Sequence, residues 1–218
     1  MARTQDRPIP PRIGAPDLPR EFDDAAPRPR ADLRHARLAG LSGDVDLSYA
    51  SLEECVVPSP AVDALALRGA TLVDVELSDV RAISVSARDA TIRRVRIVGG
   101  RIGTLDLAEA RAAELELRDL RIDYLSLAGA RVEDLRIEGC EIGSLDIPRA
   151  QLTRVAVVRS RTDELDPRGM RAADLDLRGL EMLGCLDVLS LRGATLTEDQ
   201  VRLLAPAFAQ AAGIDIRG

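Results

Sequence analysis

The side chains that could carry out acid–base or nucleophilic chemistry are few in this 218-residue chain. It has a single histidine, His35, so a Ser-His-Asp or Cys-His site has at most one base available. Adjacent carboxylates occur, as at Glu53–Glu54 and Glu133–Asp134, but such pairs are far more often solvated surface charge than an acid–base pair. No glycine-rich phosphate loop joins a strand pattern to a helix pattern. The sequence therefore predicts a protein that is not an enzyme.

The three cysteines do not predict a metal site. Cys55, Cys140 and Cys185 are far apart, and none has the C-x-x-C spacing of a zinc site or a redox pair. Thiols without an evident partner are typical of a reducing compartment. We therefore expect a cytoplasmic protein without cofactor or metal.

These residues are positioned by an internal repeat, which runs over 45–184 as 28 consecutive pentapeptides. The third residue of the pentapeptide is apolar in 26 of them and the first in 25. The exceptions are Thr162 and Pro167 at the third position, and Pro60, Gly100 and Ser160 at the first. This spacing fits neither a helix nor a continuous strand alternation. It predicts a chain that extends for about three residues with the first and third side chains inward, and then turns a corner.

A longer period, equal to four pentapeptides, lies over the period of five. Alanine recurs in one column at Ala50, Ala70, Ala90, Ala110, Ala130 and Ala150. Four pentapeptides with a corner each make a four-sided coil, and coils stack at the inter-strand spacing of about 4.8 Å. Stacking lets each coil bury side chains that it could not bury alone. The predicted fold class is an all-β solenoid of about 7–8 coils.

Several pentapeptides resemble the motif of the pentapeptide-repeat family, which centres on Leu or Phe with a small residue two before it. They are ADLRH (31–35), ASLEE (50–54), ATLVD (70–74), LDLRG (175–179) and ATLTE (194–198). The resemblance covers about residues 31–198 and implies a right-handed quadrilateral β-helix. The chain departs from the motif in having no Phe at any centre and in often having Leu at the first position, as at Leu105 and Leu125. A leucine-rich repeat is the alternative, since its period can be similar, but this chain has no Asn to form the usual turn ladder.

The resemblance also implies a possible function, because several members of that family bind DNA gyrase as mimics of DNA. A mimic should present a row of negative charge, since duplex DNA carries one charge per roughly 1.7 Å. The net charge here is −6, but Arg stands beside Asp or Glu on every side of the predicted coil. We therefore expect a non-catalytic scaffold for protein–protein interaction, with a gyrase-binding DNA mimic as the alternative. The candidate acidic patch for that alternative is Glu76, Asp79, Glu114, Glu116 and Asp119.

The first 30 residues differ from the repeat in composition. They hold seven of the twelve prolines and many arginines, which predicts an extended or disordered leader along the surface of the solenoid. They lack the apolar core of a secretory signal, and no stretch approaches the length of a membrane span. The sequence contains no basic stripe with interleaved aromatic residues, so we do not expect direct binding of nucleic acid.

The repeat has three irregular places. The pentapeptides at 31–40 are out of frame, and we expect the residues at 41–44 to restore the frame after an irregular first coil. The stretch 160–169 places polar residues and a proline in inward positions, which predicts a bulge or a loosened corner. The frame slips again at 185–188, and LSLRG at 189–193 is expected to resume the β-helix, which extends to residue 196.

Residues 197–218 change to a helical period. Thr197 and Gln200 form a capping-box signature, and the apolar residues that follow predict a helix that caps the last coil. A solenoid needs such a cap because its last coil exposes an apolar interior and an unpaired strand edge. The apolar face is wider than one contact requires, so we hypothesise that it also joins two copies of the chain in a homodimer. The predicted cap and dimer residues are Val201, Leu203, Leu204, Ala207, Phe208 and Ala211.

Overall fold

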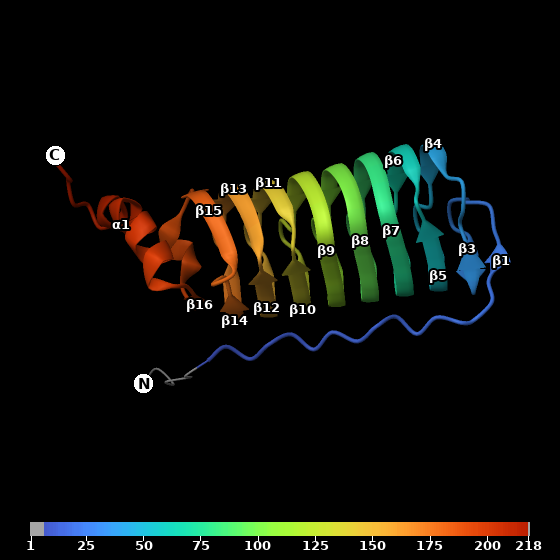
Figure 1. Ribbon diagram of the computed structural model, residues 1–218, viewed down its shortest axis with the longest axis horizontal. Coiled ribbons are helices and arrows are strands. Elements are labelled where there is room, and N and C mark those ends of the chain that lie inside the picture. Colours follow the sequence, from blue (N-terminus) through green and yellow to red (C-terminus); the bar gives the residue numbers. More distant parts are fainter. Residues whose placement is uncertain (1–6, 218) are drawn as a thin grey trace.

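A computed structural model describes residues 7–217 as a parallel β-solenoid of about eight turns that ends in one α-helix (Figure 1). The strands are β1 (Asp23–Asp24), β2 (Asp32–Arg34), β3 (Ala36–Arg37), β4 (Ser42–Asp46), β5 (Ser51–Pro58), β6 (Ala61–Ala66), β7 (Thr71–Ser86), β8 (Thr91–Asp106), β9 (Arg111–Ser126), β10 (Arg131–Glu138), β11 (Glu141–Asp146), β12 (Gln151–Val158), β13 (Ser160–Asp166), β14 (Arg171–Asp176), β15 (Leu180–Cys185) and β16 (Ala194–Thr195). The helical segments are the 3-10 helix η1 (Val188–Leu191) and α1 (Glu198–Ala211). The predicted solenoid with a C-terminal helix is confirmed.

The core is a stack of aliphatic columns in which each coil contributes one side chain to each column. Val75, Val95 and Leu115 are register partners in β7, β8 and β9, and all three are buried. Glu76 lies between the buried Val75 and Leu77 and remains partly exposed. The first and third residues of each pentapeptide therefore point inward, as the period of five predicts.

The corners of the coil are of two kinds. In the coil 125–144, three corners have a fifth residue in the left-handed region, at Gly129 (φ 66°), Asp134 (φ 60°) and Gly139 (φ 65°). This conformation favours Gly and Asp, which are frequent at the fifth position. The fourth corner, at Ser144, has no positive φ. Residues of ordinary backbone preference therefore suffice at the fourth corner.

The first coil is one residue shorter than the regular coils that follow it. Strand β4 pairs with β6 through Ser42 and Ala61 at one end and through Val45 and Leu65 at the other. Between these two pairs, β6 contains one more residue than β4. The register shifts between Gly43 and Asp44. The predicted frame correction at 41–44 is confirmed as this irregularity.

The bulge predicted for 160–169 is wrong, because β13 keeps an unshifted register with both β11 and β15. The buried hydroxyls of this stretch are satisfied by backbone groups. The Oγ of Ser160 accepts from the N–H of Cys140 (3.0 Å), and the Oγ1 of Thr162 donates to the carbonyl of Glu164 (2.9 Å). A hydroxyl that is hydrogen-bonded in this way can occupy an apolar column without opening it.

The chain leaves the regular path after β15. The prediction that LSLRG resumes the repeat at 189–193 is wrong, because η1 forms there with Asp187 as its N-cap. The ladder returns only briefly, where Ala194 of β16 pairs with Leu175 of β14. Helix α1 then begins after Thr197, whose capping box with Gln200 is confirmed.

Candidate functional site

The groups that sequence analysis considered for catalysis lie apart from one another. His35 is exposed, and its Nε2 lies 2.8 Å from a carboxylate oxygen of Glu54. Cys140 is buried, and burial raises the pKa of its thiol to about 11, so it is protonated at neutral pH and a weak nucleophile. Within residues 7–217, no three His, Cys, Asp or Glu side chains come together in a set suited to a metal ion. No helix of that range combines the length and apolar character needed to cross a membrane.

The candidate acidic patch does not form a continuous negative surface. Glu116 is buried beside Arg96, with 2.6 Å between Oε2 and Nε, and the same guanidinium lies 3.6 Å from Glu76. Asp119 lies 3.8 Å from Arg118. Each of these three carboxylates therefore has a cation beside it. The other two members of the patch, Glu114 and Asp79, have no ion pair within residues 7–217.

Opposite charges alternate between neighbouring coils on other sides of the rod as well. Glu141 lies between Arg121 (3.8 Å) and Arg161 (3.1 Å), which belong to the coils before and after it. Register partners in adjacent strands are close enough for such pairs to form. Ion pairs between coils therefore offset part of the charge on this side of the rod.

One column of corner residues carries a different set of contacts. We define the corner column as Asp74, Arg94, Glu114, Asp134, Arg154 and Asp174, which follow one another in successive coils. The leader, residues 7–22, runs along this column from the C-terminal end of the rod to its N-terminal end (Figure 1). Four backbone N–H groups of the leader donate to the column: Ile9 to Asp174 (3.0 Å), Arg12 to Asp134 (2.8 Å), Gly14 to Glu114 (3.2 Å) and Asp17 to Asp74 (2.9 Å).

The arginines of the corner column orient its carboxylates. Arg94 binds Asp74 in a bidentate pair, with both N–O distances 2.6 Å, and Arg154 binds Asp134 with both distances 2.7 Å. These hydrogen bonds hold the pKa values of Asp74 and Asp134 below the ordinary value of an aspartate. Both carboxylates are therefore ionised at neutral pH and available as acceptors for the leader.

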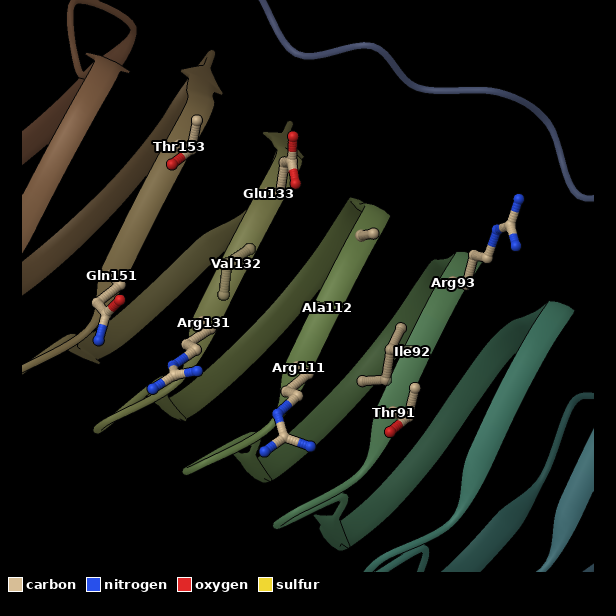
Figure 2. A pocket seen from close by; sticks show the side chains of 11 residues that line it. Thr91, Ile92, Arg93, Arg111, Ala112, Arg131, Val132, Glu133, Gln151 and Thr153 are labelled. Carbon is tan, nitrogen blue, oxygen red and sulfur yellow. The ribbon is translucent and has the colours of Figure 1, made fainter.

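A second surface is defined by arginines that form no ion pair within residues 7–217. We call it the arginine face: Arg93, Arg111, Arg131 and Arg171, on β8, β9, β10 and β14. Figure 2 shows Arg111 and Arg131 at corresponding places on adjacent strands, and they are register partners. An open groove of about 410 Å³ lies there, and the small side chains of Ala112 and Ala113 form part of its lining. The lining includes three arginines and one carboxylate, Glu133, which pairs with Arg154, so the groove combines a net positive charge with room for an extended segment.

The end of the rod carries most of the exposed large apolar side chains. Helix α1 buries Leu204 fully and Ala207 and Phe208 partly, so these three of the predicted cap residues pack on the core. Val201, Leu203 and Ala211, the other three predicted cap or dimer residues, are exposed. Leu203 lies about 100° around the helix from Leu204 and points away from the rod. We define the apolar end as the exposed Leu183, Leu186, Leu189, Val201, Leu203, Ile214 and Ile216.

Two features of the site were missed at the level of sequence. The corner column could have been found by reading every twentieth residue from Asp74, which shows carboxylates interrupted by Arg94 and Arg154. The contacts of the leader have no such signal, because they use backbone N–H groups.

The fold and the surfaces define a β-solenoid of stacked pentapeptides with a C-terminal cap. Comparison with solved structures finds similarity to QnrB1, described as a plasmid-mediated fluoroquinolone resistance protein. A trypsin-treated variant of QnrB1 is 15% identical over 86% of this chain and 99% of its own, with a TM-score of 0.34. Full-length QnrB1 is 14% identical over 82% of this chain and 99% of its own, with a TM-score of 0.34. No family model and no curated protein sequence matches the chain.

Proposed function

We propose that the protein is a non-catalytic scaffold that binds an acidic segment of a partner protein on its arginine face. The observation that carries this proposal is the clustering of unpaired guanidinium groups on one side of a rod whose other charges are mostly paired. A carboxylate that reaches Arg111 or Arg131 meets a donor that no carboxylate of the described rod already occupies. The rigid stack keeps these donors at a fixed spacing of about 4.8 Å per coil.

An acidic protein fits this face better than a nucleic acid does. Single-stranded nucleic acids are usually held by aromatic side chains on which bases stack, and the groove is lined by Thr, Ile, Ala, Val and charged or amide residues. The net charge of −6 also opposes the approach of a polyanion to the molecule as a whole. A short acidic segment meets the arginines with less of that repulsion.

Reversing the charge of one member tests the arginine face. We expect Arg131→Glu to weaken binding of a glutamate-rich peptide about tenfold or more, because it removes a donor and adds repulsion. Isothermal titration of the full chain with the peptide measures this. Arg81→Glu is the matched control, since Arg81 is also exposed and has no ion pair within residues 7–217 but lies on another side of the coil. Equal affinity of the two variants would refute the assignment.

The second candidate function is binding to DNA gyrase as a DNA mimic, which the repeat motif suggested. Its support is the rod shape and the net negative charge, while the ion pairs of Arg96 and Arg118 with the acidic patch oppose it. We expect purified protein at micromolar concentration to leave gyrase supercoiling unchanged, with or without a quinolone. Inhibition or protection would instead favour the mimic, and loss of that effect in Asp79→Ala would place the contact on the patch.

We also propose that the apolar end joins two copies of the chain. Soluble monomers rarely expose so many large apolar side chains together, and a two-fold contact pairs the same patch on both copies. We expect the protein to have the mass of a dimer in light scattering, and Leu203→Glu to give a monomer. Ile83→Glu, at an exposed site on the side of the rod, is the control that should remain dimeric. A concentration-independent monomer for the unmodified protein would contradict the proposal.

A further inference from the structure

The leader is held on the corner column by its backbone rather than by its side chains. All four hydrogen bonds use main-chain N–H groups, and no side chain from Arg7 to Phe22 is fully buried. The column therefore recognises the positions of N–H groups along an extended chain and depends little on which side chains that chain carries.

The spacing of the leader's donors matches the spacing of the column's carboxylates. From Ile9 to Arg12 the leader advances three residues while the column advances two coils, from Asp174 to Asp134. Three residues of polyproline II rise about 9.3 Å, and two coils rise about 9.6 Å. Over the whole contact, eight residues of leader rise about 25 Å and five coils about 24 Å.

The steps of the two chains also follow each other locally. The leader advances by three, two and three residues between its four donors, and the column advances by two, one and two coils. Each two-coil step passes over an arginine, Arg94 or Arg154, which has no acceptor to offer and instead holds a neighbouring carboxylate. The arrangement of charges in the column thus sets which residues of an extended chain need a free N–H group.

Prolines complete this match in the leader. Positions 8, 10, 11, 16 and 19 are proline, and none of them is one of the four donors. Proline favours the polyproline II conformation and has no N–H group, so it stiffens the chain without competing for the carboxylates. A proline-rich segment with free N–H groups at the same four spacings has everything that the column recognises.

We propose that the corner column is a binding site for a proline-rich segment of a partner protein in the polyproline II conformation, and that the leader is the resident occupant which such a segment displaces. The leader is suited to displacement because its hydrogen bonds to the column are four, lie near the surface, and are accompanied by no buried side chain. A second copy of the chain is a poorer source of the segment. Its leader continues into β1, which pairs with β3 of its own rod, and it gains no contact that it does not already have in its own molecule.

Proline substitution in the full-length chain provides the test, because it removes N–H donors and keeps the extended conformation. The release variant carries Ile9→Pro, Arg12→Pro and Asp17→Pro. The probe is a fluorescent peptide with the sequence of residues 7–20, and binding is measured by fluorescence anisotropy. We expect the peptide to bind the release variant at least tenfold more tightly than it binds the unmodified chain, where the tethered leader competes at high effective concentration. Ile13→Pro with Ala15→Pro is the matched control, since it keeps all four donors and should behave like the unmodified chain.

Alanine substitutions in the release variant locate the binding site. Asp74→Ala with Asp134→Ala should abolish peptide binding, while Asp79→Ala with Asp119→Ala, at positive-φ corners of another column, should leave it intact. Failure of the peptide to bind a folded release variant would overturn the proposal, as would equal loss in the two alanine pairs.

Two further measurements address a release variant that does not fold and an exchange of leaders between two copies of the chain. If the release variant does not fold, excess peptide must instead speed amide exchange of Ile9, Arg12 and Asp17 in the unmodified chain, and unchanged exchange would overturn the proposal. A dimer that persists with Leu203→Glu and disappears in the release variant would assign the column to leader exchange between copies, which would also overturn it.

Discussion

Leu127→Arg is expected to abolish the native fold. Leu127 is 1% exposed and occupies the third position of its pentapeptide, in a column closed by the coils above and below. A guanidinium placed there has no carboxylate within the core to pair with, and an unpaired buried charge costs more than the roughly 5–15 kcal/mol by which a domain is usually stable. We expect loss of the β-type circular dichroism spectrum and recovery of the protein mainly as aggregate.

Ile83→Arg is the matched control for this change. It introduces the same side chain in place of an aliphatic residue, but Ile83 is 67% exposed on the side of the rod. We expect its melting temperature to change little, since surface substitutions usually fall within about 0.5 kcal/mol. A soluble and fully folded Leu127→Arg protein would refute the inward assignment of the third position.

Gly100→Ala is expected to have the second largest effect, although it adds only one methyl group. Gly100 has φ 107°, and a Cβ atom there would overlap the carbonyl oxygen of Val80 in the coil below and lie 2.5 Å from the backbone nitrogen of that residue. Both the strained backbone and the clash with main-chain atoms must be relieved by opening the ladder between β7 and β8. We expect a loss of about 3–5 kcal/mol, which lowers the melting temperature by roughly 10 °C or more.

Gly40→Ala separates the clash from the backbone strain. Gly40 also has a positive φ, 67°, but a Cβ atom there would have nothing within 4 Å. We expect it to cost only the strain of an alanine in the left-handed region, about 1–2 kcal/mol. Equal melting temperatures for the two variants would show that the approach of the Val80 carbonyl is not what requires glycine at position 100.

The fold could be predicted from the sequence because each coil repeats the same physical problem. One pentapeptide would be ambiguous, but 28 in one frame leave little choice about which side chains point inward. The errors arose where a residue type was judged without its neighbours in the stack. Thr162 looked like a defect in a column of aliphatic residues, but its hydroxyl bonds to the carbonyl of Glu164 within the same strand.

The surfaces were harder to predict than the core. Arg96 and Glu116 are register partners in adjacent coils, and their pairing becomes visible only once the register of the coils is known. The acidic patch was chosen by proximity along the chain, whereas charge on a solenoid is balanced between coils. Leu203 is exposed and Leu204 is buried because of the way in which α1 packs against η1 and β15, and no local sequence pattern determines that packing.

The match between the leader and the corner column has a consequence for how this protein can change in evolution. Solenoids commonly lengthen by duplication of whole coils, which leaves the internal ladder intact. Here, a duplicated pair of coils would add two steps to the column, and the leader would need about three more residues to keep its donors in place. A single duplicated coil would require about two more residues, as in the step from Arg12 to Gly14. The length of the leader and the number of coils are thus coupled. Insertions in the part of the gene that encodes the leader and in the part that encodes the coils would have to occur together.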